Sequence, residues 1–269
     1  MLRPTLLLSA LAVPALFAQA PAPSVDQLLA KHFEADGGLA KRKAIKSLRI
    51  SAKVVGSPVE VKIILENKRP ANFRVDVNVQ GQTQSTAFDG KSGWKVDPFG
   101  GYGGNKGAEP MTADEIKDAQ VQADMDGPLV DYAAKGHKVE YLGTEAIEGA
   151  QAHKLKVSLK NGNTQTVFLD ADSFLKVKEV SKRLVRGQEV EMESILGDYK
   201  DINGLMVPFS IEQGMVGNPQ RGKIQLEKVE FDIPIEDARF KMPVVEKKPD
   251  APNPAPAKPE APKAEPKKG

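Results

Sequence analysis

Residues 48–79 read LRISAKVVGSPVEVKIILENKRPANFRVDVNV, and apolar side chains take every second position in three successive runs. The runs are centred near Ile50, Ile63 and Val75, and glycine, proline or asparagine bounds each of them. A period of two places one set of side chains on one face of a strand. The pattern predicts neighbouring antiparallel strands that are apolar on one face and polar on the other.

Alternating runs return in the second half of the chain. They cover residues 138–143, 154–159, 164–170, 175–182, 190–196, 205–215 and 223–231. An Asn-Gly pair within residues 160–163 lies between two of these runs, as is typical of a hairpin turn. About ten strands in one sheet do not stay flat, so we expect them to close into a barrel or to curl into one.

Two segments have the spacing of helices. Apolar residues between 25 and 33 recur at helical spacing behind Ser24, a good N-cap residue, and this helix is expected to end at a pair of glycines. Residues 112–115, TADE, match a capping box and predict the start of a second helix. The Gly127-Pro128 pair interrupts that helix, and we expect residues 129–132 to continue it as a second part.

The first twenty residues are typical of a secretory signal. A basic start is followed by an apolar run from Leu6 to Phe17 and by the small-x-small exit Ala18-Gln19-Ala20. The run is shorter than the ~20 apolar residues needed to cross a bilayer. The chain has no cysteine, which excludes a lipoprotein acylation site and disulfides. We therefore expect cleavage near Ala20 and a periplasmic protein that is not lipid-anchored.

The rest of the chain divides into one domain and a tail. After Pro243 the composition becomes proline, alanine, lysine and glutamate, which cannot bury enough surface to fold. We expect a signal peptide at 1–20, a single β domain at 21–245 and a disordered tail at 246–269. The formal net charge is +2, with basic and acidic residues interspersed, which argues against nucleic acid as a partner.

Patterns that carry catalysis or bind metals are weak in this chain. The glycine-rich residues 100–107 lack the Gly-Lys-Ser/Thr end of a phosphate loop, and there is no Gly-x-Ser-x-Gly elbow for a nucleophile. His32, His137 and His153 are scattered, without a second ligand at metal-binding spacing. Residues 170–173, DADS, are ordinary turn chemistry. We assign no catalytic residue, no metal site and no cofactor, and we do not expect an enzyme.

Two motifs in the first half carry a family resemblance. Taken alone, they indicate a strand, a turn and a strand. Arg69-Pro70-x-x-Phe73-Arg74 is followed by Asp89-Gly90-Lys91-x-x-Trp94-x-x-x-Pro98. Together with residues 143–157, residues 168–170 and the closing stretch 235–243, they resemble the periplasmic outer-membrane lipoprotein-sorting carriers of the LolA and LolB type. The resemblance spans nearly the whole domain.

The resemblance implies a mainly β structure with flanking helices. The expected fold is an incomplete antiparallel β-barrel of about ten to eleven strands, with helices forming a lid over an apolar cavity. It also implies that Arg69 is the latch that hydrogen-bonds the lid and holds the empty protein shut. The implied function is a non-catalytic, monomeric carrier or chaperone for lipoprotein acyl chains or another amphiphile. Its partners would be inner- and outer-membrane transfer proteins.

The expected cavity wall follows from the period of two in residues 59–77. Its members are Val59, Val61, Ile63, Leu65, Phe73, Val75 and Val77, with Trp94 from the second motif. A second hypothesis stays open, in which the same fold is a lipid-sensing or envelope-interaction module that makes contact through the tail. An enzyme of unknown class is the third.

Overall fold

The structure is a computed structural model that describes residues 22–99, 107–185 and 188–243. The expected signal peptide, the expected tail and residues 100–106 of the glycine-rich stretch lie outside these ranges. Within them, no helix is long and apolar enough to cross a membrane.

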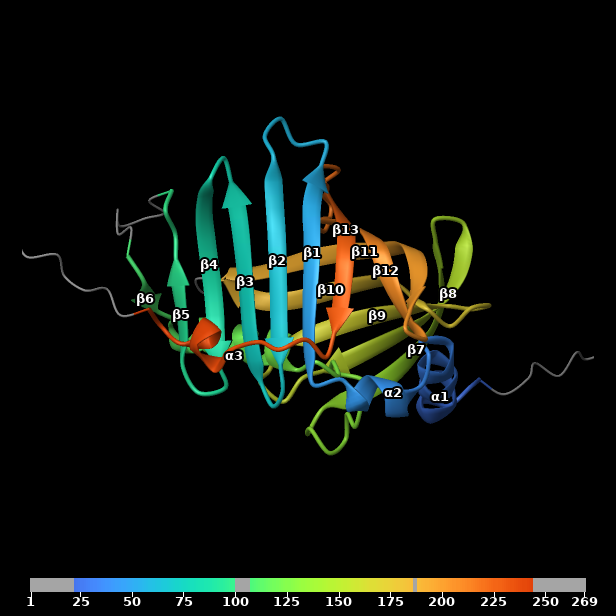
Figure 1. Cartoon of the computed structure of the whole chain (residues 1–269). Helices are drawn as coiled ribbons and strands as arrows, with labels where there is room; N and C mark the ends of the chain where they lie inside the picture. Colours follow the sequence, from blue (N-terminus) through green and yellow to red (C-terminus); the bar gives the residue numbers. More distant parts are fainter. Residues whose placement is uncertain (1–21, 100–106, 186–187, 244–269) are drawn as a thin grey trace, which may run out of the picture.

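Thirteen strands of the described residues form one antiparallel sheet, in the order β6-β5-β4-β3-β2-β1-β13-β12-β11-β10-β9-β8-β7 (Figure 1). β6 and β7 are its two edges and do not pair, so the sheet is an incomplete barrel, as expected. The strands are β1 (Ser47–Val55), β2 (Val61–Lys68), β3 (Asn72–Val79), β4 (Gln82–Asp89), β5 (Gly93–Val96), β6 (Glu109–Pro110), β7 (Lys138–Ile147), β8 (Ala150–Ser158), β9 (Thr164–Asp170), β10 (Lys176–Val185), β11 (Gln188–Ile202), β12 (Leu205–Met215) and β13 (Gly222–Phe231).

The strand count is higher than the ten to eleven expected. β6 is only two residues long, too short to be recognised from its sequence. β4 begins with the polar residues 82–86, which lack the apolar alternation that predicts a strand. β4 forms because both of its neighbours offer backbone partners, with Phe88 opposite Phe73 on one side and opposite Gly93 on the other.

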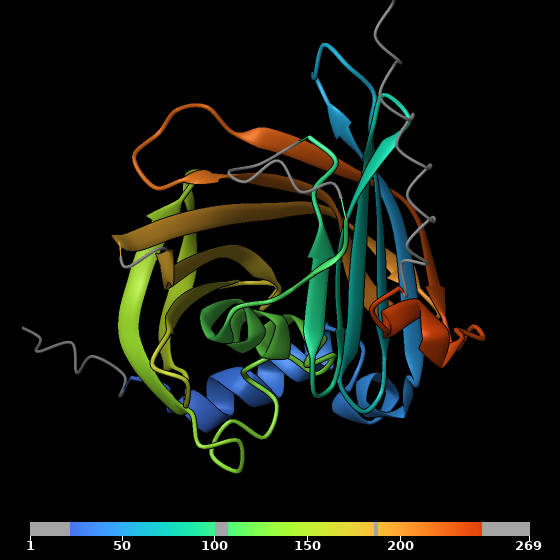
Figure 2. The ribbon, with the colours of Figure 1, turned by 90° about the vertical axis from the view of Figure 1, so that its left-hand side faces the viewer.

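The sheet consists of two meanders that β1 and β13 join. Within each of the groups β1–β6 and β7–β13, neighbouring strands follow one another in the chain. β1 and β13 are far apart in the sequence but pair side by side, with Leu48 opposite Phe231. Figure 2 shows β1–β5 on one side and β7–β9 on the other, with α1 and α3 between them. The helices therefore cover the concave side of the sheet.

The helices begin where the capping patterns predict. α1 (Val25–Ala35) has the Ser24 cap with Gln27 completing the box, and α3 (Ala113–Ala123) has Thr112 with Glu115. α1 ends at Ala35 with Asp36 as its C-cap, and the chain then turns at Gly37, where φ is +102° and a Cβ would overlap the carbonyl oxygen of Gly204. The short α2 (Leu39–Ala44) was not predicted.

The expected helical continuation at residues 129–132 is wrong. These residues form turns. Gly127 at φ +74° and Asp131 at φ +51° lie in the left-handed region, and Pro128 between them lacks a backbone donor, so the helical hydrogen-bond ladder cannot continue. This turn segment still carries Leu129 and Val130 into the core.

Three apolar clusters fill the concave side. Leu28 and Leu29 of α1 pack with Leu129 and with β8–β9 in the first, and Ala119 and Ala123 of α3 pack on Phe73 and Phe88 in the second. The third joins β1 and β2 to β12 and β13 around Ala52, Phe209 and Leu226. Each lid helix thus sits on a different half of the sheet.

Candidate functional site

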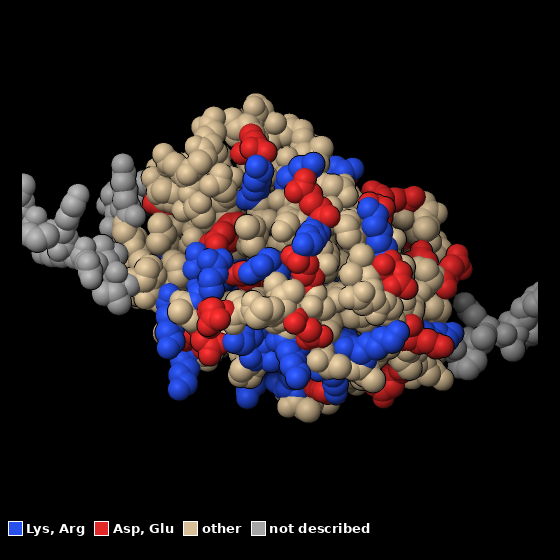
Figure 3. Space-filling model, in the orientation of Figure 1, with Lys and Arg blue, Asp and Glu red and all other residues tan. Residues whose placement is uncertain are grey.

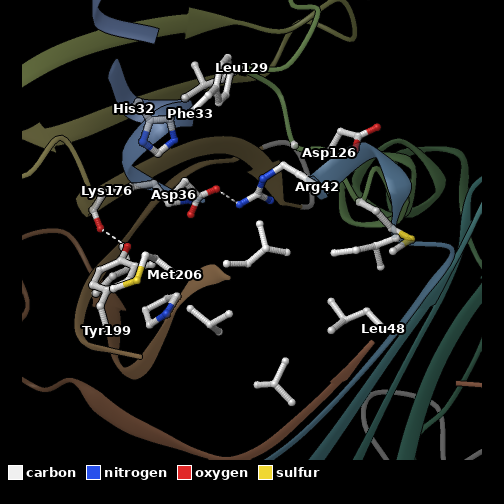
Figure 4. A pocket seen from close by; sticks show the side chains of 18 of the residues that line it. His32, Phe33, Asp36, Arg42, Leu48, Asp126, Leu129, Lys176, Tyr199 and Met206 are labelled. Carbon is white, nitrogen blue, oxygen red and sulfur yellow. Dashed lines mark hydrogen bonds and ion pairs between the residues drawn. The ribbon is translucent and has the colours of Figure 1, made fainter. Parts of the chain in front are cut away.

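A cavity of about 280 Å³ lies between the lid and the concave side of the sheet (Figure 4). Its walls come from α1, α2, the segment after α3 and strands of both meanders. The residues that line it are His32, Phe33, Asp36, Arg42, Ile45, Leu48, Ile50, Met125, Asp126, Gly127, Pro128, Leu129, Val167, Lys176, Glu179, Leu196, Tyr199, Leu205, Met206, Val207, Pro208, Val229 and Phe231. Most of these side chains are apolar.

The register of the central strands explains the apolar wall. Leu48 and Ile50 alternate along β1 and lie directly opposite Phe231 and Val229 of β13. Side chains of directly paired residues share a face, so these four make one continuous patch. Phe33 of α1 and Leu129 close the cavity from the lid side. A pocket of this composition suits an apolar chain.

Polar groups gather at the α1 and α2 end of the cavity. Asp36 forms an ion pair with Arg42 (Figure 4), and its side chain is 9% exposed. His32 Nδ1 donates to the Phe174 carbonyl oxygen at 2.9 Å, and burial lowers the His32 pKa. The Tyr199 hydroxyl donates to the Lys176 carbonyl oxygen at 2.5 Å, and burial raises the Tyr199 pKa. Both conditions keep these two side chains uncharged at neutral pH.

Arg69 lies where the lid segments meet, in the turn between β2 and β3. Its guanidinium makes a bidentate pair with Asp126, at 2.8 Å from Nη1 and 2.5 Å from Nη2. It also donates to the carbonyl oxygens of Ile45 at 2.7 Å and Arg42 at 3.3 Å. The hydrogen bond from Arg69 holds the Asp126 pKa below its usual range. One side chain therefore joins β2–β3 to the end of α2 and to the segment that follows α3.

The seven strand residues assigned to the cavity do not line it. Leu65, Phe73 and Val75 are on the concave side but pack under α3, and Ile63 packs in the cluster of β1, β12 and β13. Val61 and Val77 lie on the same face by register, and Val59 lies in the turn before β2. The cavity lies on the other side of β1, because the long-range pairing with β13 extends the concave face in that direction.

Trp94 lies on the opposite, outer face of the sheet, so its assignment to the cavity is corrected. It pairs with Ala87, which pairs with Arg74, and these positions alternate with Phe73 and Phe88. Its Nε1 donates to the Phe240 carbonyl oxygen at 2.9 Å in η1 (Asp237–Phe240). A one-residue step along a strand moves a side chain to the other face, and the motif alone does not state which face is inside.

The outer face is dominated by paired charges (Figure 3). Glu66, 1% exposed, lies between Arg49 at 2.7 Å and Arg239 at 2.9 Å. Arg74 pairs with Asp76 at 2.9 Å and lies over the Trp94 ring. Through Arg239 and Phe240, these contacts hold the C-terminal η1 segment against the outer face of β2–β5, on the side of the sheet opposite the cavity.

The turn interpretations of the two aspartates are confirmed. Asp170 Oδ1 accepts from the backbone nitrogen of Ser173 at 2.7 Å, and Asp89 Oδ1 accepts from that of Ser92 at 2.8 Å. Both carboxylates cap turns, and these hydrogen bonds hold their pKa values low. Within the described residues, no three His, Asp or Glu side chains gather at a spacing that would hold a metal ion.

The cavity residues from α2 and from β9–β13 were missed by sequence reasoning. The apolar alternation in residues 205–215 and 223–231 placed strands there but gave no reason to prefer their faces over those of β2 and β3. The sequence analysis placed His32 and Phe33 on the apolar face of an amphipathic helix. That face packs inward in the structure, and both residues therefore reach the cavity.

No protein-family model matches the chain, and no curated protein matches it in sequence at a significant level. Solved structures do match. A LolA superfamily protein of Nitrosomonas europaea has a TM-score of 0.53 at 12% identity, over 82% of this chain and 98% of its own. A DUF1329 family protein of Desulfovibrio piger has a TM-score of 0.54 at 11% identity, over 81% and 97%.

A domain of the outer-membrane lipoprotein-sorting type from Vibrio parahaemolyticus matches with a TM-score of 0.51 at 10% identity, over 80% of this chain and 95% of its own. At these identities the likeness concerns the fold. The curled, open antiparallel sheet with helices on its concave side is the architecture that the motifs around Arg69 and Asp89 indicate. The chain has a LolA-like fold.

Proposed function

We propose that this chain is a non-catalytic periplasmic carrier or chaperone that holds the acyl chains of a lipoprotein, or of another amphiphile, in the cavity beneath its lid. The observation that carries the proposal is the apolar cavity closed by lid segments that Arg69 ties together. The signal-like residues 1–20 support export, and the LolA-like fold supports a carrier.

The size of the cavity supports a closed state without cargo. Its volume of about 280 Å³ is just below the ~300–1,000 Å³ of typical ligand pockets. Long acyl chains need more room, so loading must displace the lid. Arg69 joins two of the segments that would move, the end of α2 and the turn after α3, to the strands β2 and β3. It does so through the carbonyl oxygens of Arg42 and Ile45 and through Asp126.

Energetics favour a cavity that closes when empty. Burial of an acyl chain contributes ~0.8 kcal/mol per methylene, so two long chains would exceed the roughly 18–21 kcal/mol ceiling of reversible binding. A carrier that must release cargo needs a competing process. Closure of the lid over the empty cavity supplies one, because a ligand shifts the lid equilibrium only by its preference for the open form.

The delivery step would involve an inner-membrane donor and an outer-membrane acceptor, with the chain acting as a monomer between them. A carrier of this kind needs no catalytic group. Its polar residues hold the lid and shape the cavity, as Asp36–Arg42 and Arg69–Asp126 do here.

Native mass spectrometry of the protein from its own host tests this proposal. The expected result is a mass increment that solvent extraction identifies as a lipid or a lipid-modified polypeptide. A fluorescent acyl probe loaded on the delipidated protein should then pass to acceptor vesicles. Purified protein without bound lipid that also fails to take up the probe would exclude the carrier function.

A further inference from the structure

Every charged side chain that lines the cavity has a partner within the chain. Asp36 pairs with Arg42, Lys176 pairs with Glu179 at 2.7 Å, and Asp126 pairs with Arg69 from behind the wall. The wall itself holds three acidic and two basic side chains, and Arg69 behind it supplies the third positive charge. No described charge in the wall is left to balance a charge on a ligand.

We propose that the cavity selects amphiphiles whose buried part is uncharged, such as the acyl chain of an ester or an amide, and excludes free fatty carboxylates. This inference rests on the proposed carrier function and narrows its ligand class.

The lack of an unpaired positive charge in the described wall underlies this selectivity. A ligand carboxylate beside Arg42 would share that guanidinium with Asp36, so two carboxylates would face one positive charge. Asp36 is 6% exposed as a residue, and a buried carboxylate that loses part of its counter-charge is strongly destabilised. Arg69 offers no alternative, because Asp126 and two backbone carbonyls already occupy its guanidinium.

The uncharged polar groups suit a neutral head instead. Nδ1 of His32 must carry the proton, because its partner is a carbonyl oxygen, so Nε2 of the neutral ring is an acceptor. The Tyr199 hydroxyl oxygen can accept one more hydrogen bond while it donates to Lys176. A hydroxyl or amide N–H near the start of an acyl chain finds acceptors here without the break of an ion pair.

Competition between two ligands with the same lauroyl chain tests the proposal. Monolaurin and laurate displace an environment-sensitive fluorescent probe from the delipidated protein at neutral pH, below their micelle concentrations. We expect monolaurin to bind at least about tenfold more tightly, which corresponds to about 1.4 kcal/mol. Laurate binding that equals or exceeds monolaurin binding would overturn the selectivity.

Two variants locate the cause. Asp36→Asn leaves Arg42 without its counter-ion, so the affinity for laurate relative to that for monolaurin should rise about tenfold, whatever the change in monolaurin binding itself. Glu179→Gln does the same for Lys176 and keeps the test valid if Asp36→Asn does not fold, which circular dichroism reports. Folded variants that leave the relative affinity for laurate unchanged would contradict the proposal. If neither ligand displaces the probe from any of these proteins, the carrier function itself fails and this inference fails with it.

Discussion

The two halves of the sheet hold their lid helices in different ways. α3 packs on β3–β4 through small side chains, Ala119 and Ala123, against Phe73 and Phe88. α1 packs on β8–β9 through Leu28 and Leu29. Each helix is thus buried against one half, and the lid is made of two pieces with separate anchors.

The contacts across the gap between the halves are weaker and more polar. Asn163 Nδ2 donates to Asp118 of α3 at 3.1 Å, and Val121 of α3 reaches the rim of the α1 cluster. On its own side α3 has an ion pair, Lys95–Glu115 at 2.6 Å, as well as its apolar contacts. If the lid opens as proposed, we expect it to separate between α3 and the β8–β9 hairpin, and we expect Arg69 to oppose this separation through Asp126.

The largest effects should come from truncations in the two clusters. Phe88→Ala is expected to destabilise the protein by about 3–5 kcal/mol and Leu155→Ala by about 2–5 kcal/mol, since both side chains are fully buried. Native-state hydrogen exchange should show the asymmetry. Phe88→Ala should lower the exchange protection of α3 more than that of α1, and Leu155→Ala should lower that of α1 more than that of α3. Ile64→Ala, at an exposed position, is the control. Equal loss of protection in both helices would break the comparison.

Arg69→Leu should change cargo release more than cargo uptake. Loss of its charge-assisted hydrogen bonds, about 1.5–3 kcal/mol, would shift the lid roughly ten- to over a hundredfold toward the open form. The open form lacks the closure that competes with cargo, so transfer of an acyl probe to acceptor membranes should slow. Arg221→Leu is a matched control, because Arg221 is similarly exposed and pairs with buried Glu193 on another part of the sheet. Equal transfer rates for all three proteins would remove Arg69 from the mechanism.

Acid should open the lid through Asp126. Its pKa is lowered in the closed state by the hydrogen bond from Arg69, so the latch contributes fully above the ordinary carboxyl pKa and is lost as pH falls through the lowered value. Probe accessibility of the cavity should therefore stay unchanged from neutral pH down to the ordinary aspartate pKa of roughly 4, and rise as the pH falls further toward the lowered value. Asp126→Asn should be open at all pH values and lack that part of the pH dependence. An identical pH profile in the variant would assign the opening to other carboxylates, such as Glu115.

Asn163→Ala should have a smaller effect at the boundary between the halves. It removes one part-buried hydrogen bond to α3, so the expected cost is about 0.5–1.5 kcal/mol. Exchange should quicken in α3 and stay unchanged in α1, with faster probe uptake. Asn78→Ala removes an exposed hydrogen bond, to Thr83, in a distant hairpin and serves as the control. If hydrogen exchange in α3 does not change, or if exchange in α1 changes, the lid does not open at this boundary.

The smallest effect is expected from removal of the tail. A chain that ends at Val245 should melt at nearly the same temperature, because residues 246–269 contain no apolar side chain larger than alanine. A chain that ends at Glu236 should be much less stable, since it loses Arg239 from buried Glu66 and Phe240 from Trp94. A large fall in the first variant would show that the tail packs on the domain.

Local features of this fold could be predicted because their causes are local. The capping boxes at Ser24 and Thr112, the turn at Asp170 and the alternation around Ile63 each depend on residues a few positions apart. α2 was missed because six residues with no side-chain cap give little signal. Its place follows from contacts with distant residues, since Lys41 donates to the Gly204 carbonyl oxygen and the Arg42 carbonyl oxygen accepts from Arg69.

The cavity wall was predictable only as far as alternation reaches. Period two correctly separated Ile63, Leu65 and Val75 from Lys62 and Arg74, but it did not reveal which stretch of that face α3 would cover and which would stay open. Trp94 illustrates the same limit, because its motif identifies the residue and not its face.

By itself, the sequence determined where most strands and hairpin turns lie, where α1 and α3 begin, and which side chains in a strand share a face, because these properties depend on backbone sterics and short-range spacing. The tertiary structure decided that β1 pairs with β13, that the cavity lies beside that junction, and that Asp126 meets Arg69. These outcomes depend on contacts between residues far apart in the chain, whose pairing is settled when the two meanders pack against each other and against the lid.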